Sequence, residues 1–418
     1  MKIKTLLQTA AALSLCLLMN SCSSRQAETR GHYFSVRQED GITIAVTSSI
    51  PKYEGELFRY EKVLELREDE RPESLFNRPT DFLADSQGRF YVADSGDARI
   101  AVFSPEGSYL RSIGRRGEGP GEFQAPRIQS IRNDIISVYD LLLRREVRYR
   151  TDGTLVDITS IPADHSHRPN EYFRLDEERM AQIIRQYEDV ENDRYEWAEI
   201  LIHTAAPDTV ALFATEHVLT GYRFPSVRRG LRIMQRGNYL FAPQPIAYFS
   251  PAHGFVLSSG KEPVIDVFDS SGTLQKRIRM DMAAEQVTAG DKDEVIAVFQ
   301  RDLSEADAET QTYIKEQIDN LRFMEYKPPW YAFMVDDVGF FWLIDIDTLD
   351  LQDVAEHGFD MMVLDKSGEY LGRTRFPPAL FLRFSNGRLL INNQDPETGE
   401  YSLTVYQIIP AVSGLIYP

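Results

Sequence analysis

Apolar positions in the stretch 78–113 come in short runs that are separated by tight polar turns. The runs lie at 82–83, 90–93, 100–103 and 109–113, and Asp, Ser, Gly and Pro residues occur in the turns between them. Runs of this length with such turn residues are typical of β-strands joined by hairpins. The stretch therefore predicts one antiparallel sheet of about four strands, which is the repeating unit of a β-propeller.

The last hairpin of this sheet recurs along the chain. It consists of an apolar-x-apolar-aromatic run, a glycine turn and a leucine, as in Ile100, Val102, Phe103, Gly107 and Leu110. One such sheet cannot bury both of its faces, so a recurring unit predicts sheets that pack against neighbouring copies. Further copies, of varying strength, begin at Val147, Ile200, Ile265, Met361 and Leu403. Six copies predict an all-β, six-bladed propeller.

Two segments outside the repeats complete the predicted fold. The apolar runs 41–46, 57–60 and 63–66 precede the first blade, so we expect one of these strands to complete the last blade and close the ring. The repeat is interrupted at 282–324, where the sequence predicts a two-helix insertion. We expect Asp291 to cap the first helix and the sequence 304–307, which resembles a capping box, to open the second.

The sequence allows two interpretations of the insertion and predicts a loop at one charged stretch. The two helices would pack over the rim of the propeller, or would form a lid or partner surface near the mouth of the central channel. The charged stretch 186–196 is predicted to be a solvated loop within the third blade.

Two features of the sequence carry a resemblance to a known family. The unit at 78–113 resembles an NHL repeat, and the sequence 116–123 (RGEGPGEF) is similar to the glycine-rich connector that often joins NHL blades. The whole chain resembles the six-bladed β-propeller lipoproteins of the envelopes of double-membraned bacteria. This resemblance implies a fold and a location but no reaction, because propellers host enzymes, binders and scaffolds alike.

The first residues have the pattern of an export signal. Two lysines precede the apolar run 6–18, and the sequence Leu-Met-Asn-Ser-Cys that ends at Cys22 resembles a lipobox. We therefore predict that residues 1–21 are a lipoprotein signal peptide and that Cys22 carries a lipid. Plain secretion, with Ser21 near the cleavage point, is the alternative. A transmembrane anchor is disfavoured because the apolar run is short.

The mature chain then divides into two parts. Residues 22–41 are polar with scattered charges and are predicted to be a lipidated tether. Residues 42–418 are predicted to form the propeller, with the helical insertion at about 282–324. The predicted location is the outer membrane of the cell envelope, and the sequence leaves open whether the protein faces the periplasm or the cell surface.

The charge and cysteine content narrow the range of partners and chemistry. The chain has 64 acidic and 46 basic residues and a net charge of −18. This charge argues against nucleic acid as a partner, and against a membrane contact other than the lipid. Only Cys16 and Cys22 are present, the first within the predicted signal and the second at the predicted lipidation point. Disulfides and thiolate chemistry are therefore excluded from the mature chain.

Candidate ligand-binding residues come from two places in the sequence. Arg111, Arg115 and Arg116 form a basic cluster beside the glycine-rich connector. They would hold an anionic ligand at the channel mouth, or else pair with carboxylates of nearby blades. Trp330 and Tyr331 open the most aromatic blade and are the candidate aromatic side chains at a ligand surface.

The candidate metal ligands are few. Asp345, Asp347 and Asp350 lie close together and supply the oxygen ligands that Ca²⁺ prefers, but their spacing does not follow an EF-hand loop. We favour an acidic loop without metal. His165 and His167 are spaced as a metal-binding pair on a strand would be, but flanking prolines favour a solvated loop. We therefore expect no cofactor, with Ca²⁺ as the metal that the aspartates would accept.

No motif for a nucleophile, a zinc protease or phosphate binding is present. The sequence therefore favours a non-enzymatic binding or scaffold module whose partner is a protein, a peptide or a glycan. The alternative is a metal-dependent hydrolase or lyase with its site in the central channel.

Overall fold

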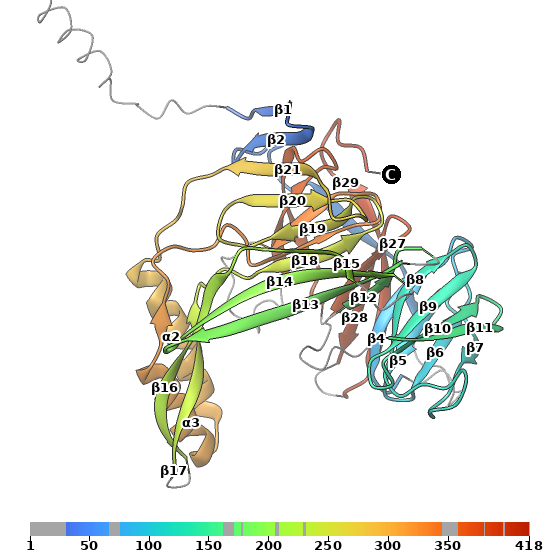
Figure 1. Cartoon of the computed structure of the whole chain (residues 1–418), viewed down its shortest axis with the longest axis horizontal. Coiled ribbons are helices and arrows are strands. Elements are labelled where there is room, and N and C mark those ends of the chain that lie inside the picture. The colour runs from blue at the N-terminus through green and yellow to red at the C-terminus, as the bar shows by residue number, and fades with distance from the viewer. Residues whose placement is uncertain are drawn as a thin grey trace, which may run out of the picture.

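In the computed structural model the strands form six β-sheets, which pack against one another (Figure 1). They form an all-β propeller with two added helices, which confirms the predicted fold class. Each sheet contains the strands of one blade, and the first strand of each blade is the innermost. The structure describes residues 31–66, 76–161, 171–176, 179–204, 209–228, 231–344, 358–379, 381–395 and 398–417.

Four of the sheets have four strands each. Blade 1 contains β4 (Pro79–Ala84), β5 (Phe90–Asp94), β6 (Arg99–Phe103) and β7 (Tyr109–Ile113). Blade 2 contains β8 (Pro126–Arg132), β9 (Ile135–Asp140), β10 (Arg145–Arg150) and β11 (Leu155–Ser160). Blade 5 contains β23 (Ala332–Val335), β24 (Phe341–Ile344), β25 (Phe359–Leu364) and β26 (Tyr370–Phe376). Blade 6 contains β27 (Phe381–Ser385), β28 (Arg388–Gln394), β29 (Tyr401–Pro410) and β3 (Phe58–Leu66).

The third and fourth blades carry extra strands. Blade 3 contains β12 (Glu171–Arg174), β13 (Arg179–Val190), β14 (Asp193–Thr204) and β15 (Thr209–Ala214). Blade 4 contains β18 (Ile246–Ser250), β19 (Gly254–Ser258), β20 (Val264–Phe268) and β21 (Leu274–Asp281). Its sheet is extended by β2 (Ile42–Ser48), which pairs parallel with β21, and by β1 (Phe34–Glu39).

The ring is closed by a strand from the beginning of the propeller sequence. β3 pairs antiparallel with β29, in a register that runs from Leu66 opposite Leu403 to Phe58 opposite Pro410. β3 therefore supplies the outer strand of blade 6, although it precedes blade 1 in the sequence. This confirms the prediction that a strand from this region completes the last blade. The pairing covers a sheet edge that would otherwise be exposed.

Apolar side chains between neighbouring blades form six clusters, one at each junction of the ring. Between blades 5 and 6 the Trp342 ring is fully buried and lies 5.3 Å from the Phe58 ring and 6.2 Å from the Tyr417 ring. Between blades 2 and 3 the buried cluster is smaller and centres on the stacked rings of Tyr139 and Tyr172. The hydrophobic core is therefore distributed around the ring, and each blade is held by both of its neighbours.

Buried aspartates join the second strand of a blade to the segment that leads into its first strand. Asp94, at the end of β5, accepts a hydrogen bond from the backbone N–H of Asn77 at 3.0 Å. Asp140, at the end of β9, accepts the backbone N–H groups of Gln124 and Ala125 at 2.7 and 3.2 Å. Both aspartates are fully buried. Because ionised acceptors form strong hydrogen bonds to N–H groups, these carboxylates fix where each inner strand begins.

A third buried aspartate, Asp336, organises the turn between β23 and β24. Its Oδ1 accepts the backbone N–H groups of Val338 and Phe340 at 3.1 and 2.7 Å. Its Oδ2 accepts the Trp342 Nε1–H at 2.9 Å and the Tyr417 hydroxyl at 3.0 Å. Burial opposes the negative charge more strongly than these donors favour it, and raises the pKa of Asp336 to about 6.

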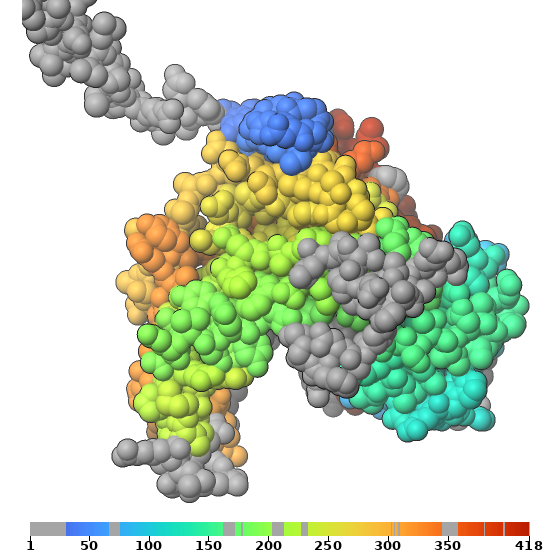
Figure 2. Space-filling model, in the orientation of Figure 1, coloured from blue at the N-terminus to red at the C-terminus, as the bar shows by residue number. Residues whose placement is uncertain are grey.

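A long hairpin of blade 3 continues into an added unit that projects from the propeller, which we call the arm (Figures 1 and 2). Within it β16 pairs with β14, and β17 pairs with β16. The arm consists of the distal halves of β13 and β14, β16 (Val218–Arg228), β17 (Leu231–Leu240), β22 (Arg322–Phe323), α2 (Ala289–Glu305) and α3 (Ala308–Asp319).

The prediction of a charged loop at 186–196 is wrong, because these residues form the ends of β13 and β14 and the turn between them. Residues of opposite charge face each other across the hairpin. Asp189 lies opposite Arg194 and accepts a hydrogen bond from its Nε at 3.2 Å. Opposite charges at facing positions stabilise a strand pair, so a charged run need not be a loop.

The two predicted helices are present, but both begin at other residues than expected. Thr288, not Asp291, is the N-cap of α2, and Asp291 completes its capping box from the third helical position. Asp307, not Ser304, is the N-cap of α3, where its carboxylate accepts the backbone N–H of Thr310 at 2.8 Å. The first helix runs to Glu305, so the predicted capping box at 304–307 overlaps its last turn.

The helices pack on the β16–β17 hairpin. The Tyr222 hydroxyl donates to the Asn320 carbonyl at 2.5 Å, and the Ser226 hydroxyl donates to Glu316 at 2.7 Å. One face of the arm's sheet is therefore covered by the helical insertion. In the part of the chain that the structure describes, no helix has the length and apolar character to cross a membrane.

The buried aspartates lead to a first prediction. We expect Asp94→Ala to lower the free energy of unfolding by about 2–4 kcal/mol, because it leaves buried N–H groups without an acceptor. The matched control is Asp97→Ala in the same turn, where the side chain is 42% exposed and we expect little change. Thermal unfolding followed by circular dichroism measures both, and equal losses would contradict the assigned role of Asp94.

The raised pKa of Asp336 leads to a second prediction. Between the unfolded value of 3.8 and the folded value of about 6, the folded state binds a proton that the unfolded state does not bind. We therefore expect the stability of the wild type, relative to Asp336→Asn, to rise as pH falls from about 7 to about 4, by at most roughly 3 kcal/mol. Urea unfolding at several pH values measures the difference, and a difference independent of pH would contradict this prediction.

Candidate functional site

The inner strands of all six blades meet around a central channel that contains two adjoining cavities. One cavity, of about 190 Å³, lies toward the ends of these strands, and the other, of about 270 Å³, lies toward their starts. Side chains alternate along a strand, so each inner strand turns every second residue toward the channel. The side chains that line both cavities are Gln129, Phe173, Tyr248, Arg383 and Phe384.

The cavity near the strand starts contains a buried carboxylate between two arginines. Asp81, whose side chain is 2% exposed, accepts hydrogen bonds from Arg383 Nη2 at 2.8 Å and from Arg383 Nε at 3.2 Å. Arg127 Nη1 lies 3.7 Å from the other carboxylate oxygen. The Arg127 and Arg383 side chains remain 43% and 31% exposed. Two guanidinium groups therefore lie beside one buried carboxylate, and each keeps part of its surface in the cavity.

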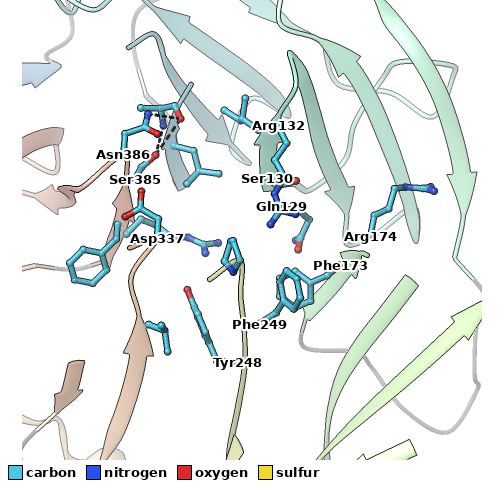
Figure 3. A pocket seen from close by; sticks show the side chains of 17 residues that line it. Gln129, Ser130, Arg132, Phe173, Arg174, Tyr248, Phe249, Asp337, Ser385 and Asn386 are labelled. Carbon is cyan, nitrogen blue, oxygen red and sulfur yellow. Dashed lines mark hydrogen bonds between the residues drawn. The ribbon is translucent and has the colours of Figure 1, made fainter. Parts of the chain in front are cut away.

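Aromatic side chains form the opposite wall of the channel. Phe173 on β12 packs against Phe249 on β18, with ring centroids 5.1 Å apart. Tyr248 lines both cavities, and its side chain points toward the open centre (Figure 3). The channel thus combines charged groups on blades 1, 2 and 6 with aromatic faces on blades 3 and 4.

The cavity near the strand ends is lined by polar groups. Gln129 and Asp337 point toward its centre in Figure 3, whereas Arg174 points away. Arg174 Nε donates to Glu146 at 2.8 Å, so its charge is neutralised outside the channel. The carboxylate of Asp337 accepts the backbone N–H of Gly387 at 3.1 Å. This cavity offers hydrogen-bond donors and acceptors with one carboxylate and the exposed Arg132 at its edge.

The described lining of the two cavities contains charged, aromatic and amide side chains. It includes no histidine or cysteine. Among the described residues, no three His, Cys, Asp or Glu side chains gather in a way that would hold a metal ion. What the channel provides is a guanidinium pair for an anionic group, aromatic faces for stacking, and amide and hydroxyl groups for hydrogen bonds.

The predicted arginine cluster lies at the junction of blades 1 and 2, and it lines neither channel cavity. Arg115 Nε donates to Glu122 at 2.8 Å, which matches the alternative of pairing with a nearby carboxylate. Arg116 donates to the Gly96 carbonyl at 2.5 Å, and Arg111 donates to the Thr151 carbonyl. The structure therefore gives Arg111, Arg115 and Arg116 local partners in blade 2, the connector and blade 1, respectively.

The two predicted aromatic residues have different surroundings. Trp330 is 1% exposed and belongs to the apolar cluster between blades 4 and 5, so it has no exposed face for a ligand. Tyr331 is 48% exposed but lines neither channel cavity. The remaining candidates lie outside the described residues: Cys22, His165, His167, Asp345, Asp347 and Asp350.

The sequence analysis missed Asp81, Arg127 and Arg383. Their signal is positional: each lies at an alternate position near the start of the first strand of its blade. A charged residue at such a position faces the channel, so alignment of the six inner strands would have selected these three.

Comparison with known proteins gives one family. Residues 73–205 match the family DUF5128, described as a 6-bladed beta-propeller. The match covers blade 1, blade 2 and part of blade 3, which is less than half of the chain. No curated protein matches the chain.

Solved structures with similar folds have low identity to this chain. A Bacteroides fragilis protein described as exported has 11% identity and a TM-score of 0.47, over 87% of this chain and 99% of its own. A member of the DUF4221 family from Bacteroides vulgatus has 10% identity and a TM-score of 0.47, over 85% and 99%. Virginiamycin B lyase from Staphylococcus aureus has 9% identity and a TM-score of 0.35, over 84% and 88%. Likeness at this level carries no argument about ligand or activity.

The family match and the six sheets agree on the architecture. The chain is similar to a six-bladed propeller family over its first blades, and its remaining sheets complete a ring of the same number.

Proposed function

We propose that this protein is an envelope lipoprotein whose propeller acts as a binding module, and that its central channel takes an anionic group of a peptide or glycan ligand. The observation that carries this proposal is the placement of Arg127 and Arg383 around Asp81 in a channel with an aromatic wall. Both guanidinium groups keep part of their surface exposed to the cavity, and an exposed guanidinium edge can donate hydrogen bonds to an anionic group.

The location in this proposal rests on the sequence. The basic and apolar N-terminal pattern and the lipobox-like sequence at Cys22 support export and lipidation. An acidic chain without thiol chemistry is compatible with an extracytoplasmic binding protein. The lipid at Cys22 would be the contact with the membrane, and the ligand would come from the surrounding compartment.

The channel geometry supports a ligand of limited size. Cavities of about 190 and 270 Å³ accommodate one or two sugar or amino-acid residues rather than a folded domain. The stacking faces of Phe173 and Tyr248 lie across the channel from the arginines, so a ring or side chain would rest on them while its anionic group contacts Arg127 and Arg383.

A third prediction tests this proposal. We expect the mature protein to bind trigalacturonate or triglutamate, and Arg127→Gln to weaken that binding about tenfold, because one charged contact is lost while the polar side chain remains. Isothermal titration calorimetry measures the affinity, with neutral maltotriose as the ligand control. The matched variant is Arg37→Gln on β1, whose side chain is 55% exposed and outside the channel. Equal affinity in wild type and Arg127→Gln, or no binding of either anionic probe, would contradict the proposal.

A fourth prediction separates this proposal from the metal-dependent alternative. We expect chelator to leave the melting temperature of the purified protein unchanged, and we expect metal analysis to find no stoichiometric ion, because binding requires no metal here. A stoichiometric ion whose removal lowers the melting temperature would instead support the hydrolase or lyase alternative. The variants to follow would then be those of Asp345, Asp347 and Asp350.

A further inference from the structure

The sheet of the arm has one covered face and one open face. On the covered face, Ser226 and Gln235 form hydrogen bonds with Glu316 and Gln317 of α3. Side chains alternate along each strand, so the neighbouring positions on β16 and β17 point to the other side. There Arg223 lies opposite Arg236 in the strand pairing, on the side away from the contacts with α3.

The open face combines arginine, aromatic and methionine side chains. Tyr187 is 53% exposed, Met234 is 54% exposed, and the Arg236 side chain is 55% exposed. Among the side chains that the structure describes, strand alternation places four arginines and two carboxylates on this face: Arg185, Arg194, Arg223, Arg236, Asp189 and Glu196. The face is thus positive, whereas the whole chain has a net charge of −18.

Contacts within the face hold the arginines in place. Asp189 accepts hydrogen bonds from Arg194 and Arg223, and Arg236 Nη2 lies 3.9 Å from its carboxylate. The Arg194 guanidinium lies 4.2 Å from the centre of the Tyr187 ring, and that of Arg236 lies 5.6 Å from it. Burial opposes ionisation of Asp189, but Arg194 and Arg223 together hold its pKa below the usual range. Preorganised side chains lose little conformational entropy when a partner binds.

We propose that the open face of the arm, formed by Tyr187, Asp189, Arg194, Arg223, Met234 and Arg236, is a docking surface for an acidic segment of a partner protein. This is a second site, separate from the channel and independent of the ligand proposed for it.

Two observations select a protein partner with acidic residues. On this face arginines outnumber carboxylates, so the face attracts a negatively charged partner. The chain as a whole is acidic, so the rest of its surface repels such a partner. Tyrosine, arginine and methionine are the residue types enriched at protein interfaces, and tyrosine and arginine are frequent hot spots. Neither channel cavity includes any of these residues, so the arm presents a surface rather than a pocket.

The position of the arm favours a protein over a membrane surface. The described chain begins beside β1, and β1 and the β16–β17 hairpin lie at opposite ends of the view in Figure 1. If the lipid at Cys22 anchors the protein, the arm extends away from the anchored end. The space-filling view shows the arm projecting from the body of the molecule (Figure 2).

The fifth prediction uses a fluorescein-labelled glutamate- and tyrosine-rich peptide as the probe, with enough trigalacturonate present to fill the channel so that the peptide reports on the arm. We expect the mature protein to bind it at low ionic strength, less tightly at physiological ionic strength. We expect Met234→Ser combined with Arg236→Glu to weaken binding about tenfold. This pair leaves the Asp189 contacts of Arg194 and Arg223 intact, so the arm stays folded. Fluorescence anisotropy measures the affinity, and thermal melting checks the fold.

Two control variants locate the effect. Arg388→Glu changes an exposed arginine of blade 6, and Arg127→Gln changes the channel. We expect both to bind the peptide as the wild type does, and the arm variant to bind trigalacturonate as the wild type does. Failure of the channel proposal and failure of this one are therefore separate results.

Three outcomes would overturn the proposal. The first is equal peptide binding by the wild type and the arm variant. The second is binding to phosphatidylglycerol vesicles that the arm variant loses, which would identify a membrane surface as the occupant. The third is self-association in sedimentation experiments that the arm variant loses, which would identify a second copy of this chain.

Discussion

The pairing of β3 with β29 is the constraint on which the rest of the structure depends. It joins residues 58–66 to residues 403–410, so nearly the whole propeller sequence lies between the two strands. With this pairing, Phe58 reaches Trp342 and Leu66 joins the cluster between blades 6 and 1. All six junctions then exist at once, and no blade is left with an unpacked face. Such long-range contacts slow folding, because the chain must be ordered before the closing contact forms.

Ring closure is also what creates the channel site. Asp81 and Arg383 are separated by some three hundred positions, yet the contact of blade 6 with blade 1 places them in hydrogen-bond distance. Asp81 is buried, and its carboxylate accepts hydrogen bonds from Arg383 of blade 6 and lies 3.7 Å from Arg127 of blade 2. The same arginines keep part of their surface in the cavity. The buried ion pair and the proposed binding of an anionic group thus involve the same three side chains.

The local parts of this fold and the closing strand were predictable from the sequence, whereas the side-chain contacts between distant segments were not. Hairpins repeat because period-two apolar runs and turn glycines are local signals, and Gly107, Gly272 and Gly368 indeed have positive φ angles of 86°, 83° and 98°. Local signals gave a wrong prediction for 186–196. The high charge of this stretch indicates a loop, whereas the structure pairs Asp189 with Arg194 across a hairpin. Aromatic content likewise singled out Trp330, which the packing of blades 4 and 5 buries.

The topology places the arginine end of the channel and the arm on one face of the propeller. A connector that leaves the outer strand of one blade arrives at the start of the next inner strand, and Asp81 and Arg127 lie near such starts. The arm is built from two connectors of the same kind, between β15 and β18 and between β21 and β23, and from the β13–β14 hairpin that turns at this face. The chain has a net charge of −18, so two arginine-rich sites on one face make the electrostatic potential there more positive than over the rest of the surface. An acidic partner approaching the molecule would therefore be oriented toward this face before it makes contact.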